Sequence, residues 1–121
     1  MGKTILSADD SASLRQMISF TLRDAGYDVV EAVVGRKALA EITASTPHML
    51  ITDLNMPNLH GIELIRQVRT RPQCKYIPID MLTTESQDAK QQEGRAAGAS
   101  GWIVKPFRTE QLVMVARKLL P

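Results

Sequence analysis

Apolar and polar residues alternate along the chain with two different periods. Short, nearly continuous apolar runs predict buried strands, and longer stretches with apolar residues every three or four positions predict amphipathic helices. The predicted strands cover residues 3–8, 27–33, 48–53, 76–84 and 101–104. The predicted helices cover residues 11–26, 35–45, 61–70, 86–99 and 108–120. Strands and helices therefore follow one another in strict alternation.

This alternation predicts an α/β fold. Strands that are separated by helices form parallel sheets, with right-handed crossovers and helices on both faces. We therefore expect a doubly wound, five-stranded parallel sheet with five helices. The 121 residues leave no length for a linker, so residues 1–121 are expected to form one domain.

Local signals mark the ends of one helix and a weakness in another. Asp10 or Ser11 is the expected N-cap of the first helix, and Gly26 is expected to end it. The stretch 86–99 contains few large apolar residues. It also contains Gly94, which has a low helix propensity, so we expect a weak helix that is broken there.

Composition narrows the class of protein. The chain is 44% hydrophobic and 23% charged, which is typical of a soluble globular domain, and no apolar run approaches the ~20 residues of a membrane span. Its single cysteine, Cys74, cannot form an internal disulfide, so a cytoplasmic location is expected. The net charge is only +2, and the scattered basic residues lack stacking aromatics, so no nucleic-acid partner is expected. His48 and His60 lack the companions of a zinc site.

Polar residues follow four of the predicted strands at the point where each strand ends. They are Asp9, Asp10, Asp53, Thr83 and Lys105. Each has an ordinary explanation when taken alone, as a helix cap, a turn residue or a solvated charge. Because the carboxyl ends of parallel strands meet at one edge of the sheet, where α/β proteins bind ligands, the set together predicts a site.

The chemistry of this set favours a metal and a phosphoryl group. Two carboxylates 4 Å apart repel by up to about 4 kcal/mol at an effective dielectric constant near 20, and a divalent cation removes that repulsion. Oxygen ligands without sulfur or paired imidazoles suit Mg²⁺, which also binds phosphoryl oxygens. Lys105 and Thr83 are placed to contact further phosphoryl oxygens. The central acid, Asp53, is then the expected nucleophile.

Four motifs in fixed order resemble the receiver domains of bacterial two-component response regulators, in particular the single-domain chemotaxis (CheY) type. They are "DDS" after the first strand, "DLNMPNLHG" after the third, "LTTE" after the fourth and "KPF" after the fifth. The resemblance covers essentially the whole chain. It implies a flavodoxin-like receiver fold with strand order 2-1-3-4-5, and phosphorylation by a histidine kinase that changes the affinity for a protein partner.

The resemblance also implies roles at the metal and phosphoryl sites. Asp53 is the phosphoacceptor, Asp10 and Asp53 bind Mg²⁺ directly together with the main-chain carbonyl of Asn55, and Asp9 holds a metal-bound water. Lys105 contacts the phosphoryl group or a carboxylate, and its bond to Pro106 is expected to be cis.

Further roles concern switching and phosphate lifetime. Thr83 is the switch hydroxyl, and Trp102 stands at the position of the switch aromatic, although it could also simply cover an edge strand. Asn55 and Glu85 occupy the positions that tune phosphate lifetime. The weak helix at 86–99 suits a bistable element.

Three residues depart from the family pattern. Relatives usually carry apolar residues where this chain has Ser7 and Asp80, and Val34 stands where a small or polar residue is usual. Asp80 lies in a strand expected to be buried on both faces. It has a partner, lies on an exposed edge, or is an introduced change, and the sequence does not choose among these.

Alternative functions stay open at this point. The expected partners are a histidine kinase, a phosphatase and a downstream target protein, such as the flagellar motor switch. The downstream target is expected to bind the face formed by residues 86–120. The protein is expected to be a monomer and not an enzyme. The leading hypothesis is a signalling switch, and nothing in the sequence excludes an intermediate that relays phosphate between other proteins. A phosphatase of the haloacid dehalogenase type requires a second acid two residues after the nucleophile. This chain has Asn55 at that position, which disfavours this alternative. A degenerate receiver is disfavoured by the intact acids and Lys105.

Overall fold

The computed structural model describes residues 3–33, 35–54, 60–83 and 88–120, which build a five-stranded parallel sheet. The strand order is β2-β1-β3-β4-β5. The strands are β1 (Thr4–Ala8), β2 (Asp28–Ala32), β3 (Met49–Asp53), β4 (Ile79–Thr83) and β5 (Gly101–Val104). The predicted fold class and strand order are therefore confirmed.

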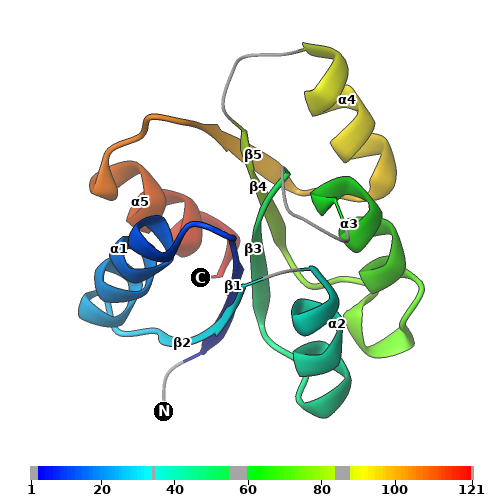
Figure 1. Ribbon diagram of the computed structural model, residues 1–121, viewed down its shortest axis with the longest axis horizontal. Helices are drawn as coiled ribbons and strands as arrows, with labels where there is room; N and C mark the ends of the chain where they lie inside the picture. Colours follow the sequence, from blue (N-terminus) through cyan, green and yellow to red (C-terminus); the bar gives the residue numbers. More distant parts are fainter. Residues whose placement is uncertain (1–2, 34, 55–59, 84–87, 121) are drawn as a thin grey trace.

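The helices form one layer on each face of this sheet (Figure 1). One layer consists of α1 (Ala12–Asp24) and α5 (Thr109–Leu119). The other consists of α2 (Gly35–Ala44), α3 (Gly61–Arg69) and α4 (Asp88–Ala97). Two apolar cores result, one under each layer, and β3 is buried along its whole length between them. None of the described helices is long and apolar enough to cross a membrane.

The ends of α1 are those that the sequence predicts. Ser11 is the N-cap, and its hydroxyl accepts a hydrogen bond from the backbone N–H of Leu14 at 3.3 Å. Gly26 adopts a left-handed φ of 100° directly after the helix, a conformation that costs glycine little because it has no Cβ.

Strand β4 is shorter than its predicted range of 76–84. It begins at Ile79 because Pro78 has no backbone N–H to donate to the sheet, although the carbonyl of Pro78 still accepts from Leu50 at 3.0 Å. A short 3₁₀ helix, η1 (Pro72–Cys74), precedes it and is absent from the sequence prediction. Residue 84, at the other predicted end, lies outside the described residues.

The predicted break of the fourth helix at Gly94 is wrong. Helix α4 continues through Gly94, which is buried against the side chain of Met81 so closely that a Cβ would overlap the Met81 sulfur. Close packing on the sheet therefore outweighs the low helix propensity of glycine, which costs only about 1 kcal/mol. The Arg69 guanidinium holds the far end of this helix by donating to the Gly98 carbonyl at 2.8 and 3.0 Å.

Two of the unusual polar residues are buried in the sheet beneath α1 and α5. Asp80 has no exposed surface, Ser7 is 1% exposed, and both align with Ile51 across the strands. Within the described part of the chain, neither the Ser7 hydroxyl nor either Asp80 oxygen has a hydrogen-bond partner. Burial alone raises the pKa of Asp80 to about 7. Val34 lies outside the described residues.

Candidate functional site

The carboxyl edge of the sheet brings the predicted site residues together. Asp53 is the last residue of β3 and Thr83 the last of β4, while Asp9 and Lys105 directly follow β1 and β5. Because β1, β3, β4 and β5 are adjacent and parallel, their ends share one edge. The backbone N–H of Lys105 donates to the Thr83 carbonyl at 2.6 Å, so the parallel pairing extends to the site itself.

Three carboxylates form the acidic part of the site. One oxygen from each of Asp9, Asp10 and Asp53 lies within 4.8 Å of the others. Asp9 is fully buried, Asp53 is 4% exposed, and Asp10 is exposed to solvent. The cluster therefore has a buried floor and an open side, which a ligand can approach past Asp10.

Lys105 is the cation of the site. Its Nζ lies 3.2 Å from Asp53 Oδ1 and 3.6 Å from Asp9 Oδ2. These are ion-pair distances, but neither oxygen accepts a hydrogen bond from the described residues. One ammonium thus partly balances two buried carboxylates and leaves acceptor capacity unused. The Lys105–Pro106 bond is cis, as the resemblance implies.

Asp9 is held by hydrogen bonds to its carboxylate and its carbonyl, and burial disfavours the charged form of its carboxyl group. Its Oδ1 accepts a hydrogen bond from the Ser11 backbone N–H at 2.8 Å, and its carbonyl accepts one from the Arg15 guanidinium at 2.9 Å. Burial raises the pKa of Asp9, and the Asp53 carboxylate raises it further, while the Ser11 hydrogen bond and the Lys105 ammonium lower it. The net rise means that the Ser11 hydrogen bond and the Lys105 ammonium do not fully compensate for the burial of this carboxylate.

The backbone of Asp53 is fixed by a residue that the sequence analysis did not single out. Gly61, at the start of α3, packs so closely that a Cβ would overlap the Asp53 carbonyl oxygen. Its N–H also donates to the Leu54 carbonyl at 3.0 Å. The Thr52 hydroxyl donates to the same Asp53 carbonyl at 2.9 Å. Glycine at the end of the quoted "DLNMPNLHG" motif was the available signal for this close approach.

The predicted switch residues lie on the adjacent strands β4 and β5, where Thr83 aligns with Val104 and Trp102 lies two residues before Val104. The Thr83 hydroxyl is buried and has no hydrogen-bond partner in the described ranges. Trp102 is partly buried and aligns with Met81, two residues before Thr83 on β4. Asn55 and Glu85 lie outside the described residues, so their expected roles stay predictions.

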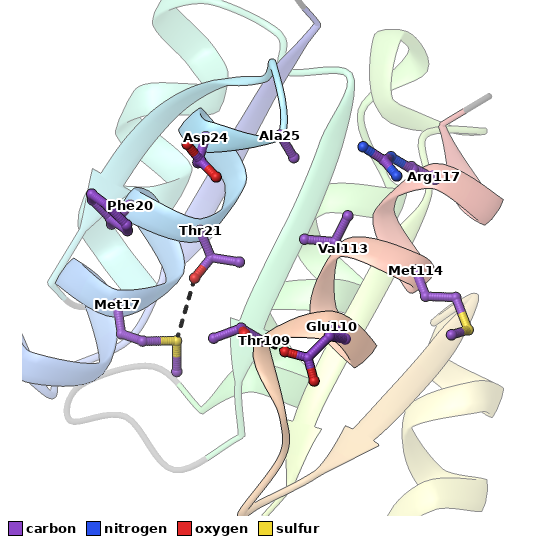
Figure 2. A pocket seen from close by; sticks show the side chains of 10 residues that line it. All are labelled: Met17, Phe20, Thr21, Asp24, Ala25, Thr109, Glu110, Val113, Met114 and Arg117. Atoms are coloured by element: carbon purple, nitrogen blue, oxygen red, sulfur yellow. Dashed lines mark hydrogen bonds between the residues drawn. The ribbon is translucent and has the colours of Figure 1, made fainter.

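A separate groove of about 720 Å³ lies between α1 and α5 (Figure 2). Its walls include Phe20 and Met114, two exposed apolar side chains. No residue of the acidic cluster lines it. The groove is therefore separate from the carboxylate cluster at the sheet edge.

The chain belongs to the response regulator receiver domain family, whose model matches residues 5–117. It is 41% identical over 110 residues to chemotaxis protein CheY1 of Helicobacter pylori, covering 89% of each chain. It is also 37% identical over 120 residues to the phosphate regulon transcriptional regulatory protein PhoB of Pseudomonas aeruginosa, but spans only 52% of that protein. Among solved structures, chemotaxis response regulator CheY4 of Vibrio cholerae matches with a TM-score of 0.95 and 47% identity, covering 99% of this chain and 100% of that one.

Proposed function

We propose that this receiver domain is a phosphorylation-activated switch of a bacterial two-component system. In this proposal Asp53 accepts a phosphoryl group from a histidine kinase, and the phosphorylated protein changes its affinity for a downstream protein. The observation that carries the proposal is the Lys105 ammonium, which lies within ion-pair distance of both Asp53 and Asp9 at an edge rich in carboxylates. This arrangement suits a group that brings further negative charge together with a divalent cation.

The donor set fits Mg²⁺. Ligands about one Mg²⁺ lie roughly 3–4 Å apart, because each sits about 2.0–2.1 Å from the ion. The Asp10 and Asp53 carboxylate oxygens, which lie within 4.8 Å of each other, need only small adjustments to meet this requirement. Asp10 and Asp53 would bind the ion directly together with the carbonyl of Asn55, and Asp9 would hold a water bound to it. The ion would supply neutralisation of phosphoryl charge during transfer.

Lys105 and Thr83 complete the site for phosphoryl transfer. An Asp53 carboxylate oxygen forms a bond to phosphorus while the bond to the donor's leaving group breaks, and the leaving group keeps the electron pair. The Lys105 ammonium stabilises charge on the transferred group. The Thr83 hydroxyl, buried and unpartnered in the described residues, donates to a phosphoryl oxygen and so gains the hydrogen bond that it lacks.

A chemotaxis role is the more specific part of the proposal. It is supported by the similarity to CheY1 of Helicobacter pylori and to CheY4 of Vibrio cholerae, because the match covers 89% of CheY1 and 100% of the CheY4 chain. The output surface would be the face formed by α4, β5 and α5, where β5 is the edge strand of the sheet. Asn55 and Glu85 would tune phosphate lifetime. A phosphorelay intermediate would use the same site and differs in passing its phosphoryl group to another protein.

Trp102 is the only tryptophan and provides the test of switching. Its emission and its quenching by acrylamide are measured before and after addition of acetyl phosphate with Mg²⁺. Asp53→Asn, treated in the same way, separates quenching by the metal from switching. We expect a spectral change in the wild type that the variant lacks, and identical responses would refute the switch.

A further inference from the structure

A contact between α4 and β5 lies on the face opposite α1 and α5. The guanidinium carbon of Arg95, on α4, lies over the Trp102 ring at 4.9 Å from its centroid. This distance is within the range of a cation–π interaction. The structure shows no ion pair or hydrogen bond of Arg95 with any described residue, so the ring is its identified partner.

Trp102 borders two hollows. A hollow of about 200 Å³ on the α4 side is lined by Gln91, Gln92, Arg95 and Trp102. A second hollow, of about 530 Å³, is lined by Trp102 together with Lys105, Met114 and neighbours on β5 and α5. The ring packs on the core that lies under α2, α3 and α4, and the Arg95 contact adds to that packing.

The ring also lies beside the residues of β4 that connect the acidic cluster to α4. Trp102 aligns with Met81, and Thr83 follows two residues later on the same face of β4. Met81 in turn fills the space beneath Gly94, the residue before Arg95. A movement of the Thr83 hydroxyl toward a ligand would therefore alter the surroundings of Met81 and Trp102. Through these two residues it would alter the packing of α4 on the sheet.

We propose that Arg95 is a positioning residue that holds Trp102 beneath α4 in the unphosphorylated protein, and thereby opposes the switch. This inference rests on the proposed function, because it assumes that occupation of Asp53 favours another position of the ring. A contact made in one state only shifts the equilibrium by its full interaction energy. For a cation–π pair that is partly exposed, the expected shift is about two- to fivefold in the apparent affinity for the activating ligand.

Beryllium fluoride, which binds carboxylates as a phosphoryl analogue, makes the shift measurable at equilibrium. Its half-saturating concentration is determined by calorimetry at fixed Mg²⁺, so that the readout does not depend on tryptophan emission. Arg95→Gln should bind it about two- to fivefold more tightly than the wild type. Arg95→Lys, which keeps a cation, should stay close to the wild type. Lys75→Gln removes a cation lying 5.6 Å from the Tyr76 ring centroid elsewhere on the surface and should change nothing.

A double-mutant cycle separates the contact from a general effect on α4. In a Trp102→Leu background, Arg95→Gln should leave the affinity unchanged, because the ring is already gone. An equal effect in both backgrounds, or no tightening in Arg95→Gln alone, would overturn the inference while leaving the proposed function intact. If the wild type itself binds no beryllium fluoride and Asp53 takes up no phosphoryl group, the proposed function fails and the inference with it. Arg95 is exposed on its helix, so folding should survive, and thermal melts verify this.

Discussion

The Lys105 ammonium lies 3.2 Å from Asp53 Oδ1 and so joins the end of β5 to the end of β3 across the intervening strand β4. The same strand β5 carries Trp102 three residues earlier. A change of charge at Asp53 therefore acts on Lys105, which directly follows the edge strand. This relationship connects the acidic cluster to the surface at which we place the output.

Replacing Lys105 with methionine separates metal binding from phosphoryl transfer. Lys105→Met removes a positive charge that competes with Mg²⁺ for the same carboxylates, so Mg²⁺ should bind more tightly. One unit charge at about 4 Å in water is worth about 1 kcal/mol, which corresponds to roughly fivefold in affinity. Phosphoryl uptake should nevertheless fall, because the transferred group loses a cationic partner. Calorimetric titration with Mg²⁺ and the rate of phosphorylation measure the two effects, and weaker Mg²⁺ binding would contradict this account of Lys105.

Asp80 should make the stability of the protein depend on pH. Its pKa is about 7 in the fold against an ordinary value of 3.8, because burial disfavours the charged form. Between these two values the folded state holds a proton that the unfolded state has released, so stability falls as pH rises from about 4 to about 7. A pKa difference of three units corresponds to a loss of roughly 4 kcal/mol in the free energy of unfolding, and this loss is complete above pH 7.

Two substitutions test this origin of the pH dependence. Asp80→Leu should be more stable than the wild type at pH 7.5, by at least the roughly 1–3 kcal/mol of a polar burial penalty, and should retain phosphorylation at Asp53. Asp80→Asn keeps a polar side chain but removes the titrating group. It should therefore lose the dependence of stability on pH and gain less stability than Asp80→Leu. Urea unfolding at pH 5 and pH 7.5 gives the comparison, and subtraction of variant from wild type cancels the contribution of Asp9. A less stable Asp80→Leu would reveal a partner for this carboxyl.

Gly61 should be required for the position of Asp53. In Gly61→Ala the new Cβ meets the Asp53 carbonyl, which is backbone and cannot move aside without shifting the strand end. We expect a loss of about 1–3 kcal/mol in stability and slower phosphorylation. Gly101→Ala is the matched control, because a Cβ there lies 3.4 Å from Asp80 Oδ1, an ordinary contact. Equal behaviour of the two variants would show that the close approach at Gly61 has no consequence.

The sequence predicted those features that follow from the order of strands along the chain. Parallel strands place their carboxyl ends at one edge, so Asp9, Asp53 and Lys105 had to meet there. Side chains alternate between the two faces of a strand, and Met81 and Leu82 of β4 accordingly belong to the two separate cores.

The sequence did not predict contacts that depend on how closely helices approach the sheet. Gly94 was expected to break α4, because helix propensity is a local quantity and the packing of Met81 beneath this glycine is not. The close approach of Gly61 to Asp53 and the stacking of Arg95 on Trp102 also join residues whose proximity requires the three-dimensional path of the chain.

The most direct test of the account is the intact mass of the protein after incubation with acetyl phosphate. With Mg²⁺ present, the wild type should gain the mass of one phosphoryl group, and Asp53→Asn should gain none. Without a divalent cation, the wild type should also stay unmodified, because the carboxylate cluster then lacks the ion that neutralises phosphoryl charge. Equal labelling of wild type and Asp53→Asn, or labelling of the wild type that does not depend on the cation, would contradict the assignment of Asp53 as the phosphoacceptor.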